Sequence, residues 1–126
     1  MLKNIVIAML VLGLAGICLF QGWYLSDAVS DLQKTTAELQ TELDADNWEA
    51  AQDVYQKLMR HWDKNFKLLS CFLLHEEVDH AGVELQSIGA QLELRDKQML
   101  SYSIPRLCYY LKHMQDGDSL QIENIL

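Results

Sequence analysis

The chain carries an uninterrupted apolar run near its N-terminus, Ile5–Leu25, which reads IVIAMLVLGLAGICLFQGWYL. The run is 21 residues long and contains no charge and no proline. A helix of this length spans about 30 Å, the thickness of the hydrocarbon core of a bilayer, and it satisfies its own backbone hydrogen bonds there. Trp23 and Tyr24 at its distal end suit the headgroup layer. The run therefore predicts a transmembrane helix embedded in a lipid bilayer.

Two other uses of such a run are a cleaved signal peptide and a lipoprotein signal. Lys3 gives the short basic start of a signal peptide, but cleavage after Gly13 and Ala15 would leave a long apolar segment at the new N-terminus. A lipoprotein needs a small residue directly before Cys18, and Ile17 stands there. We therefore expect the run to remain as an anchor.

The charges that flank the run predict its orientation. Lys3 precedes it, whereas Asp27 and Asp31 follow it and the first later base is Lys34. Because basic residues favour the cytoplasmic side, we expect the N-terminus in the cytoplasm and residues 27–126 outside the cell membrane.

Composition predicts that the remaining 100 or so residues are helical and acidic. The chain has one proline and six glycines, and three of the glycines lie inside the apolar run, which leaves little material for turns and strands. The net charge is −8, and it becomes −9 for residues 27–126 once Lys3 is left out. Since such a surface repels polyanions, we expect neither nucleic acid nor anionic lipid headgroups as partners.

Apolar residues after the run repeat at helical spacing, so we expect the first helix to continue as a juxtamembrane stalk over residues 26–45. The repeat steps by 4, 3, 4, 3 and 4 through Leu25, Val29, Leu32, Thr36, Leu39 and Leu43. This stripe would pack either on the later helices of the chain or on a second copy. Asp46 and Glu49 then form a D-x-x-E pattern that predicts the start of the next helix.

The second helix predicted by this periodicity has no glycine or proline between residue 47 and Ala81. It would run unbroken to about Leu92 or break near Lys64-Asn65. Trp48 and Trp62 share its apolar stripe, and this stripe is either core or a surface that contacts a partner.

A last helix is expected from a cap at Asp96 to about Gln115. Its apolar residues again step by 4 and 3, in the set Leu100, Ile104, Leu107, Leu111 and Met114. Pro105 predicts a kink or a restart within it. We expect Asp116-Gly117-Asp118 to end the helix and the tail to fold back onto the bundle.

The three cysteines Cys18, Cys71 and Cys108 are isolated, and without C-x-x-C spacing they form no zinc or redox motif. Two arrangements of the later pair are considered, a Cys71–Cys108 disulfide and two buried free thiols.

One segment, His75-Glu76-Glu77-Val78-Asp79-His80, concentrates residues that bind metals. A zincin requires histidines at i and i+4, and these two are five residues apart. The segment also holds a Glu-x-x-His pair, but di-iron bundles need two. We expect His75 and Asp79 to form a local pair on one helix face, with the other polar residues of the segment facing water. The alternative is a metal site of His75, Glu77 and Asp79 completed by His61 or His113.

No phosphate loop, nucleophile elbow or cysteine–histidine signature is found, so we expect neither an enzyme nor a cofactor.

Three signatures make the chain similar to a known family. They are Trp48-Glu49-x-Ala51; Trp62 followed by Phe72-Leu73-Leu74-His75-x-Glu77-x-Asp79; and Leu120-x-Ile122-Glu123-Asn124-Ile125-Leu126. With the N-terminal run, they resemble the uncharacterised bacterial single-pass membrane proteins of the domain-of-unknown-function family 4363. Pro105 and His80 depart from its pattern. The resemblance implies a helical domain at the cell membrane and singles out His75, Glu77, Asp79 and Asn124. It supplies no activity, because none is established for the family.

We therefore predict an all-α protein: an N-terminal transmembrane helix extended by a stalk, then a small antiparallel helical bundle. The expected parts are an anchor (1–25), a stalk (26–45), a bundle of two or three helices (46–116) and a C-terminal tail (117–126).

The expected function is a non-enzymatic, membrane-anchored interaction or scaffolding protein in cell-envelope or sporulation assembly. It would bind another protein or a second copy, with Trp48, Trp62 and Asn124 as interaction candidates. The alternative is a metal-binding sensor or carrier built on the His75–Asp79 cluster.

Overall fold

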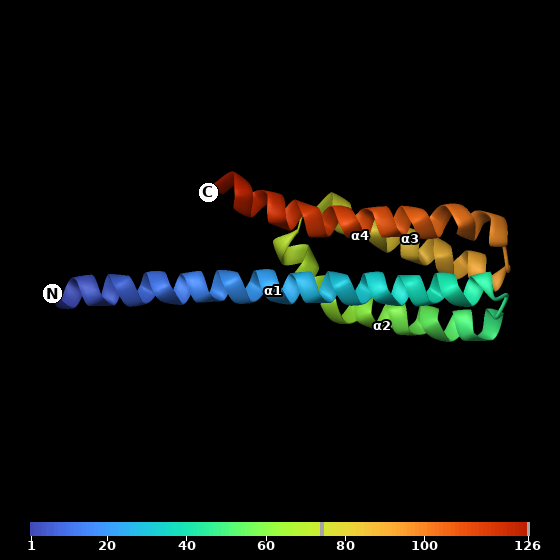
Figure 1. Cartoon of the computed structure of the whole chain (residues 1–126), viewed down its shortest axis with the longest axis horizontal. Helices are drawn as coiled ribbons and strands as arrows, with labels where there is room; N and C mark the ends of the chain where they lie inside the picture. Colours follow the sequence, from blue (N-terminus) through green and yellow to red (C-terminus); the bar gives the residue numbers. More distant parts are fainter. Residues whose placement is uncertain (74, 126) are drawn as a thin grey trace.

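The structure is an antiparallel bundle of four helices with one long helical extension (Figure 1). This computed structural model describes residues 1–73 and 75–125, with side chains for all of these except Phe72, His75 and 116–125. The helices are α1 (Leu2–Asp44), α2 (Trp48–Phe72), α3 (His75–Glu93) and α4 (Lys97–Ile125). The described residues contain no strand, so the predicted all-α class and helical bundle are confirmed.

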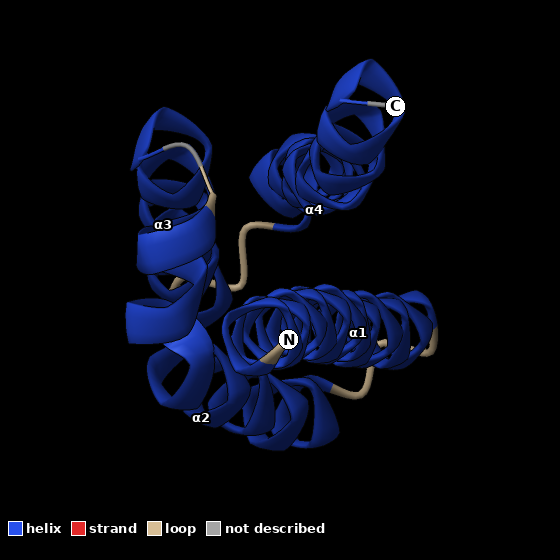
Figure 2. Ribbon diagram, turned by 90° about the vertical axis from the view of Figure 1, so that its left-hand side faces the viewer, coloured by secondary structure: helices blue, strands red, loops and turns tan. Residues whose placement is uncertain are grey.

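Successive helices run in opposite directions, and each packs on its neighbours around a square (Figure 2). The second half of α1 lies between α2 and α4, and α3 closes the square on the opposite side. Residues 26–45, expected as a stalk beside a bundle of two or three helices, therefore form one of four bundle helices. The first half of α1 extends beyond the bundle, away from the α3–α4 loop (Figure 1).

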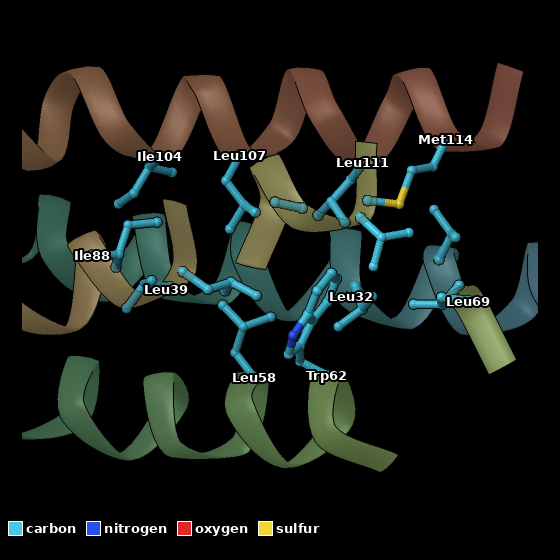
Figure 3. Packing of buried hydrophobic residues seen from close by; sticks show 14 of the residues in the cluster. Leu32, Leu39, Leu58, Trp62, Leu69, Ile88, Ile104, Leu107, Leu111 and Met114 are labelled. Atoms are coloured by element: carbon cyan, nitrogen blue, oxygen red, sulfur yellow. The ribbon is translucent and has the colours of Figure 1, made fainter. Parts of the chain in front are cut away.

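The core is built from the apolar stripes that all four helices turn inward (Figure 3). The α1 stripe packs on the chain's own helices, as the first of its two interpretations predicted: Leu32 and Leu39 are 0% exposed and Leu25 is 4% exposed. Thr36, also buried in this stripe, donates its hydroxyl to the Leu32 carbonyl oxygen at 2.7 Å, so no polar group is left without a partner there.

Of the two helix caps predicted from the sequence, one is correct and one is wrong. Asp96 caps α4 as predicted, since its Oδ1 accepts a hydrogen bond from the Met99 backbone N–H at 3.1 Å. The predicted cap of α2 at Asp46 is wrong. Asp46 adopts a positive φ of 56° and pairs with Lys97 at 2.6 Å, and Asn47 takes the capping position. The tight turn after α1 needs a residue that tolerates the left-handed region, and Asp46 supplies it.

The boundary between α2 and α3 lies between Phe72 and His75, so both predicted alternatives, an unbroken helix and a break near Lys64-Asn65, are wrong. Asn65 stays inside α2 because its Nδ2 donates to the His61 carbonyl oxygen at 2.8 Å. Its amide is thus satisfied within the helix, although the residue is only 6% exposed.

The fourth helix is longer than predicted, because it neither restarts at Pro105 nor ends at Asp116-Gly117-Asp118. Pro105 removes the helical partner of the Ser101 carbonyl oxygen, and both residues are exposed, so water can hydrate that oxygen. A glycine ends a helix when it adopts a positive φ, and none of the described glycines does. The expected fold-back of the tail is therefore wrong, and α4 continues to Ile125.

Candidate functional site

No described side chain of the bundle buries the first half of α1. Every residue from Met1 to Phe20 is exposed, including large apolar side chains such as Leu12 (72% exposed) and Leu19 (77%). Within the described residues α1 is the one helix long and apolar enough to cross a membrane. This exposed apolar segment is therefore the first candidate for a contact with something outside the described bundle.

An apolar hollow of about 250 Å³ lies where this segment meets the bundle. Phe20, Gln21 and Tyr24 of α1 line it together with Leu68 of α2. The Tyr24 hydroxyl donates to Asn65 Oδ1 at 3.5 Å, which ties the end of α2 to the same level of α1. The last turns of α2 therefore lie beside the last turn of the predicted membrane span.

The polar segment at the start of α3 is held against α4. Glu77 Oε1 lies 2.5 Å from His113 Nδ1, and the Glu77 side chain is only 17% exposed. The expectation that Glu77 faces water is therefore wrong, because packing of α3 on α4 brings His113 to it. The pair is ionic when the imidazole is protonated.

Aromatic rings cover this Glu77–His113 pair. Together with Glu76, Glu77, His80 and His113, Tyr109 and Tyr110 line a hollow of about 260 Å³ between α3 and α4. The ring centroids of His80 and Tyr110 are 5.6 Å apart, and those of Tyr109 and His113 are 6.0 Å apart. The arrangement is a polar contact that joins two helices, with one carboxylate and one imidazole directly paired.

The predicted metal ligands do not come together as one group. Asp79 is exposed and borders a groove on the opposite side of α3, beside Trp62 of α2, whereas Glu77 and His113 border α4. The side chain of His75 lies outside the described residues. Among the side chains that the structure describes, no three His, Cys, Asp or Glu residues lie close enough to hold a metal ion.

The interaction candidates have different environments. Trp62 is 5% exposed and belongs to the core, which favours the first of its two interpretations. Trp48 is half-buried, and the Arg95 guanidinium lies 5.9 Å from its ring centroid. The side chain of Asn124 lies outside the described residues. Trp48 is therefore the candidate with a partly accessible ring.

The cysteines follow neither predicted arrangement. Cys18, Cys71 and Cys108 are all free and exposed, so the structure contains neither a Cys71–Cys108 disulfide nor buried thiols at these positions. Burial of part of the Cys108 side chain by its surroundings still raises the pKa of that thiol.

Exposed aromatic residues on α4 were not singled out from the sequence. Tyr102 is 59% exposed and Tyr109 is 64% exposed, and Met99 (43%) lies on the same side of the helix. The sequence spacing of these tyrosines relative to the core leucines could have identified them. Each tyrosine is two residues after a core leucine, Leu100 or Leu107, which places it on the outward face.

Comparison with known proteins identifies a family and nothing finer. No curated protein and no solved structure matches the chain. The family described as "Domain of unknown function (DUF4363)" matches residues 19–125, which include the end of the apolar run and the whole bundle. The chain therefore belongs to the DUF4363 family.

Proposed function

We propose that this protein is a membrane-anchored, non-enzymatic interaction module, with α1 in the cell membrane and the bundle in contact with another protein. The observation that carries the proposal is the exposed apolar half of α1. An apolar surface that surrounds a helix from Ile5 to Phe20 is not stable in water, and lipid is the partner that covers all its sides.

The proposed orientation has the N-terminus in the cytoplasm and the bundle outside. Lys3 is the one charged side chain before the span, and Asp27 is the first after it. The process that suits such a module is the assembly of the cell envelope or of the spore.

The outward face of α4 is the surface that we propose for protein contact. Met99, Tyr102 and Tyr109 gather on it, and exposed tyrosines supply much of the binding energy in protein interfaces because they bury a large ring and keep a polar group. Tyr109 also covers the Glu77–His113 pair, so a partner on this face would contact the joint between α3 and α4.

The anchor is tested by placing one charge in the span. Leu12→Arg opposes insertion by about 3 kcal/mol, so we expect part of the protein to leave the membrane fraction during alkaline extraction and vesicle flotation. The matched control is Leu94→Arg, because Leu94 is an equally exposed leucine (78%) at the far end of the bundle. Loss of both variants from the membrane, or of neither, would contradict the proposed role of the span.

Orientation is tested with a thiol reagent that cannot cross the membrane. Cys108 is exposed on α4, so we expect it to react in intact cells. Labelling that requires cell lysis would place the bundle in the cytoplasm.

The interaction is tested by in-cell crosslinking of the tagged full-length chain, followed by detergent extraction and quantification of what copurifies. We expect one protein at an amount comparable to the bait, reduced about tenfold or more in Tyr102→Ser/Tyr109→Ser. Val83→Ser removes an exposed apolar residue (63%) from α3 and serves as the control. Recovery of the chain alone as a monomer would contradict the proposal.

A further inference from the structure

We propose that the membrane-proximal end of α2 binds an anionic glycerophospholipid, so that the bundle rests on the bilayer through a second contact besides the α1 span. The surface, named here the α2 basic edge, consists of Arg60, Lys64 and Lys67. This inference rests on the membrane anchoring proposed above, and it adds a specific lipid class and a binding surface to it.

The height of the α2 basic edge above the membrane is set by α1. This helix is continuous from Leu2 to Asp44, so each residue moves the chain by a constant 1.5 Å along its axis. Leu68 shares a hollow with Phe20 and Tyr24, and Asn65 accepts the Tyr24 hydrogen bond. The end of α2 therefore lies at the boundary between hydrocarbon and headgroups whenever residues 5–25 span the bilayer.

The three cations lie on one face of α2, because they are spaced at i, i+4 and i+7. All three are exposed, and none belongs to an ion pair with another described side chain. Arg60 is seven residues, or about 10 Å of helix, farther from the membrane than Lys67. Long basic side chains within this distance reach headgroup phosphates or lie within one Debye length of them.

The cations are concentrated at this end of α2, although the protein as a whole is acidic. Residues 57–67 hold four of the ten lysines and arginines and a single acid, Asp63. The fourth cation, Lys57, is farther from the membrane and pairs with Glu38 at 3.4 Å. Because salt screens charges beyond about 10 Å, this local charge acts on the membrane surface more strongly than the net charge of the chain.

The opposite edge of the same end is acidic. Glu76 of α3 is exposed there, on the side of α3 that borders α4. An anionic membrane surface therefore attracts the α2 basic edge and repels the start of α3. The bundle would tilt so that its α2 side lies closer to the membrane. The hollow beside Leu68 has an apolar lining and opens next to the basic edge, so it fits the acyl segment of the lipid whose headgroup Lys64 and Lys67 would bind.

The test uses two native cysteines of the full chain as reporters. Cys71 lies in the last turn of α2, and Cys108 lies on α4. Gln33 Nε2 donates to Gln115 Oε1 at 3.4 Å, so the antiparallel register places Cys108 beside residue 40 of α1, about 24 Å above Tyr24. Each cysteine is labelled with bimane after the other two are replaced, and the protein is reconstituted in vesicles of equal parts phosphatidylcholine and phosphatidylglycerol.

We expect spin-labelled lipid to quench the Cys71 probe and leave the Cys108 probe unaffected. Spin-labelled phosphatidylglycerol should quench Cys71 about twofold more than spin-labelled phosphatidylcholine, and high salt should remove the difference. Lys64→Gln/Lys67→Gln should also remove it. Lys34→Gln/Lys112→Gln is the matched control. It removes two exposed charges that lie about 15 Å or more above the level of Tyr24, so it should preserve the difference.

The two proposals fail in different ways. A chain that does not float with the vesicles overturns the membrane anchor and this inference together. A chain that floats but shows equal quenching by the two lipids, or no more quenching at Cys71 than at Cys108, overturns the anionic-lipid contact alone. If both double variants lost the preference for phosphatidylglycerol equally, the anionic-lipid contact would also be overturned. The preference would then depend on the net charge of the protein and not on the α2 basic edge.

Discussion

The two halves of α1 form one continuous helix but place their apolar residues differently. Residues 2–20 are exposed on every side, and most of them are apolar. Residues 25–44 bury one stripe against α2 and α4 and expose polar residues elsewhere. Both halves are helical because the backbone bonds are internal to the helix in either surrounding. Apolar residues around the whole circumference of a helix are typical of contact with lipid, whereas an apolar repeat on one side is typical of contact with protein.

This continuity also connects the apolar half of α1 to the bundle mechanically. Since no loop or glycine turn separates the two halves, the bundle cannot move along the α1 axis without the apolar half. With the apolar half in the bilayer as proposed, the positions of Tyr24, Leu68 and the α2 basic edge relative to the bilayer follow from this connection.

The largest expected effect is a difference in stability between two leucine-to-alanine variants, one in each half of α1. Leu32→Ala should lower the free energy of unfolding of the bundle by about 2–5 kcal/mol, because Leu32 is 0% exposed in the core. Leu12→Ala should leave that free energy unchanged. The measurement is urea denaturation of the full chain in mild detergent, followed by tryptophan fluorescence, to which the buried Trp62 contributes together with Trp23 and Trp48. Similar losses in both variants would show that the exposed half also supports the bundle.

A smaller effect on stability is expected from alanine at two glycines. The space around the first, in the apolar half of α1, is open, and the space around the second, in the bundle, is filled. A Cβ at Gly16 meets nothing within 4 Å, whereas a Cβ at Gly89 would collide with the Tyr55 hydroxyl and lie 2.8 Å from its Cζ. Gly89→Ala should therefore destabilise the bundle by about 1–2 kcal/mol despite the better helix propensity of alanine.

The controls for Gly89→Ala are Gly16→Ala and Gly82→Ala. At Gly82 the nearest atom, in Trp62, is at an ordinary contact distance of 3.5 Å, so alanine should stabilise α3 by up to about 1 kcal/mol. Thermal unfolding by circular dichroism measures all three. A stabilising Gly89→Ala would show that Tyr55 is free to move.

The smallest effect is a dependence of bundle stability on alkaline pH. The Tyr55 hydroxyl donates to the Leu85 carbonyl oxygen at 2.9 Å, and burial, followed by the charges of Glu93 and Asp63, raises the pKa of Tyr55 above its usual 10.0. The folded state thus retains this proton at a pH where the unfolded state has lost it. Stability is full below pH 10 and falls as the pH rises through the folded pKa.

Tyr55→Phe should remove this alkaline slope and lower stability at neutral pH by about 1 kcal/mol through loss of the hydrogen bond. The matched control is Tyr102→Phe on the outward face of α4. Urea denaturation at several pH values above 9 measures the slope, and an unchanged slope in Tyr55→Phe would assign it to another group.

Local patterns predicted the parts of the fold that depend on neighbours in the sequence. The apolar stripes of α1 and α4 and the cap at Asp96 were all correct, because each depends on residues within about one or two turns. The cap of α2 and the end of α4 were wrong. Asp46 and Gly117 have intrinsic preferences that more than one backbone conformation satisfies, and the rest of the chain selects among them.

The candidate site was less predictable than the fold. Glu77 and His113 are 36 residues apart, so their contact depends on the register between α3 and α4. The polar segment containing His75 and Asp79 was visible in the sequence, but the side of α3 on which each residue meets a partner was not. The α2 basic edge was hidden by a net charge of −8, which says nothing about where the cations lie.

The sequence by itself determined that the chain is helical, that its first helix has an apolar half suited to lipid, and that each later helix has one buried face. These properties follow from hydrophobicity and periodicity along single helices. Only the tertiary structure decided that the stalk is a bundle helix, that Trp62 is core, and that Lys64 and Lys67 lie level with the end of the apolar run. Those placements depend on which helices pack together and in what register, and this register is fixed by side-chain packing between residues distant in the chain.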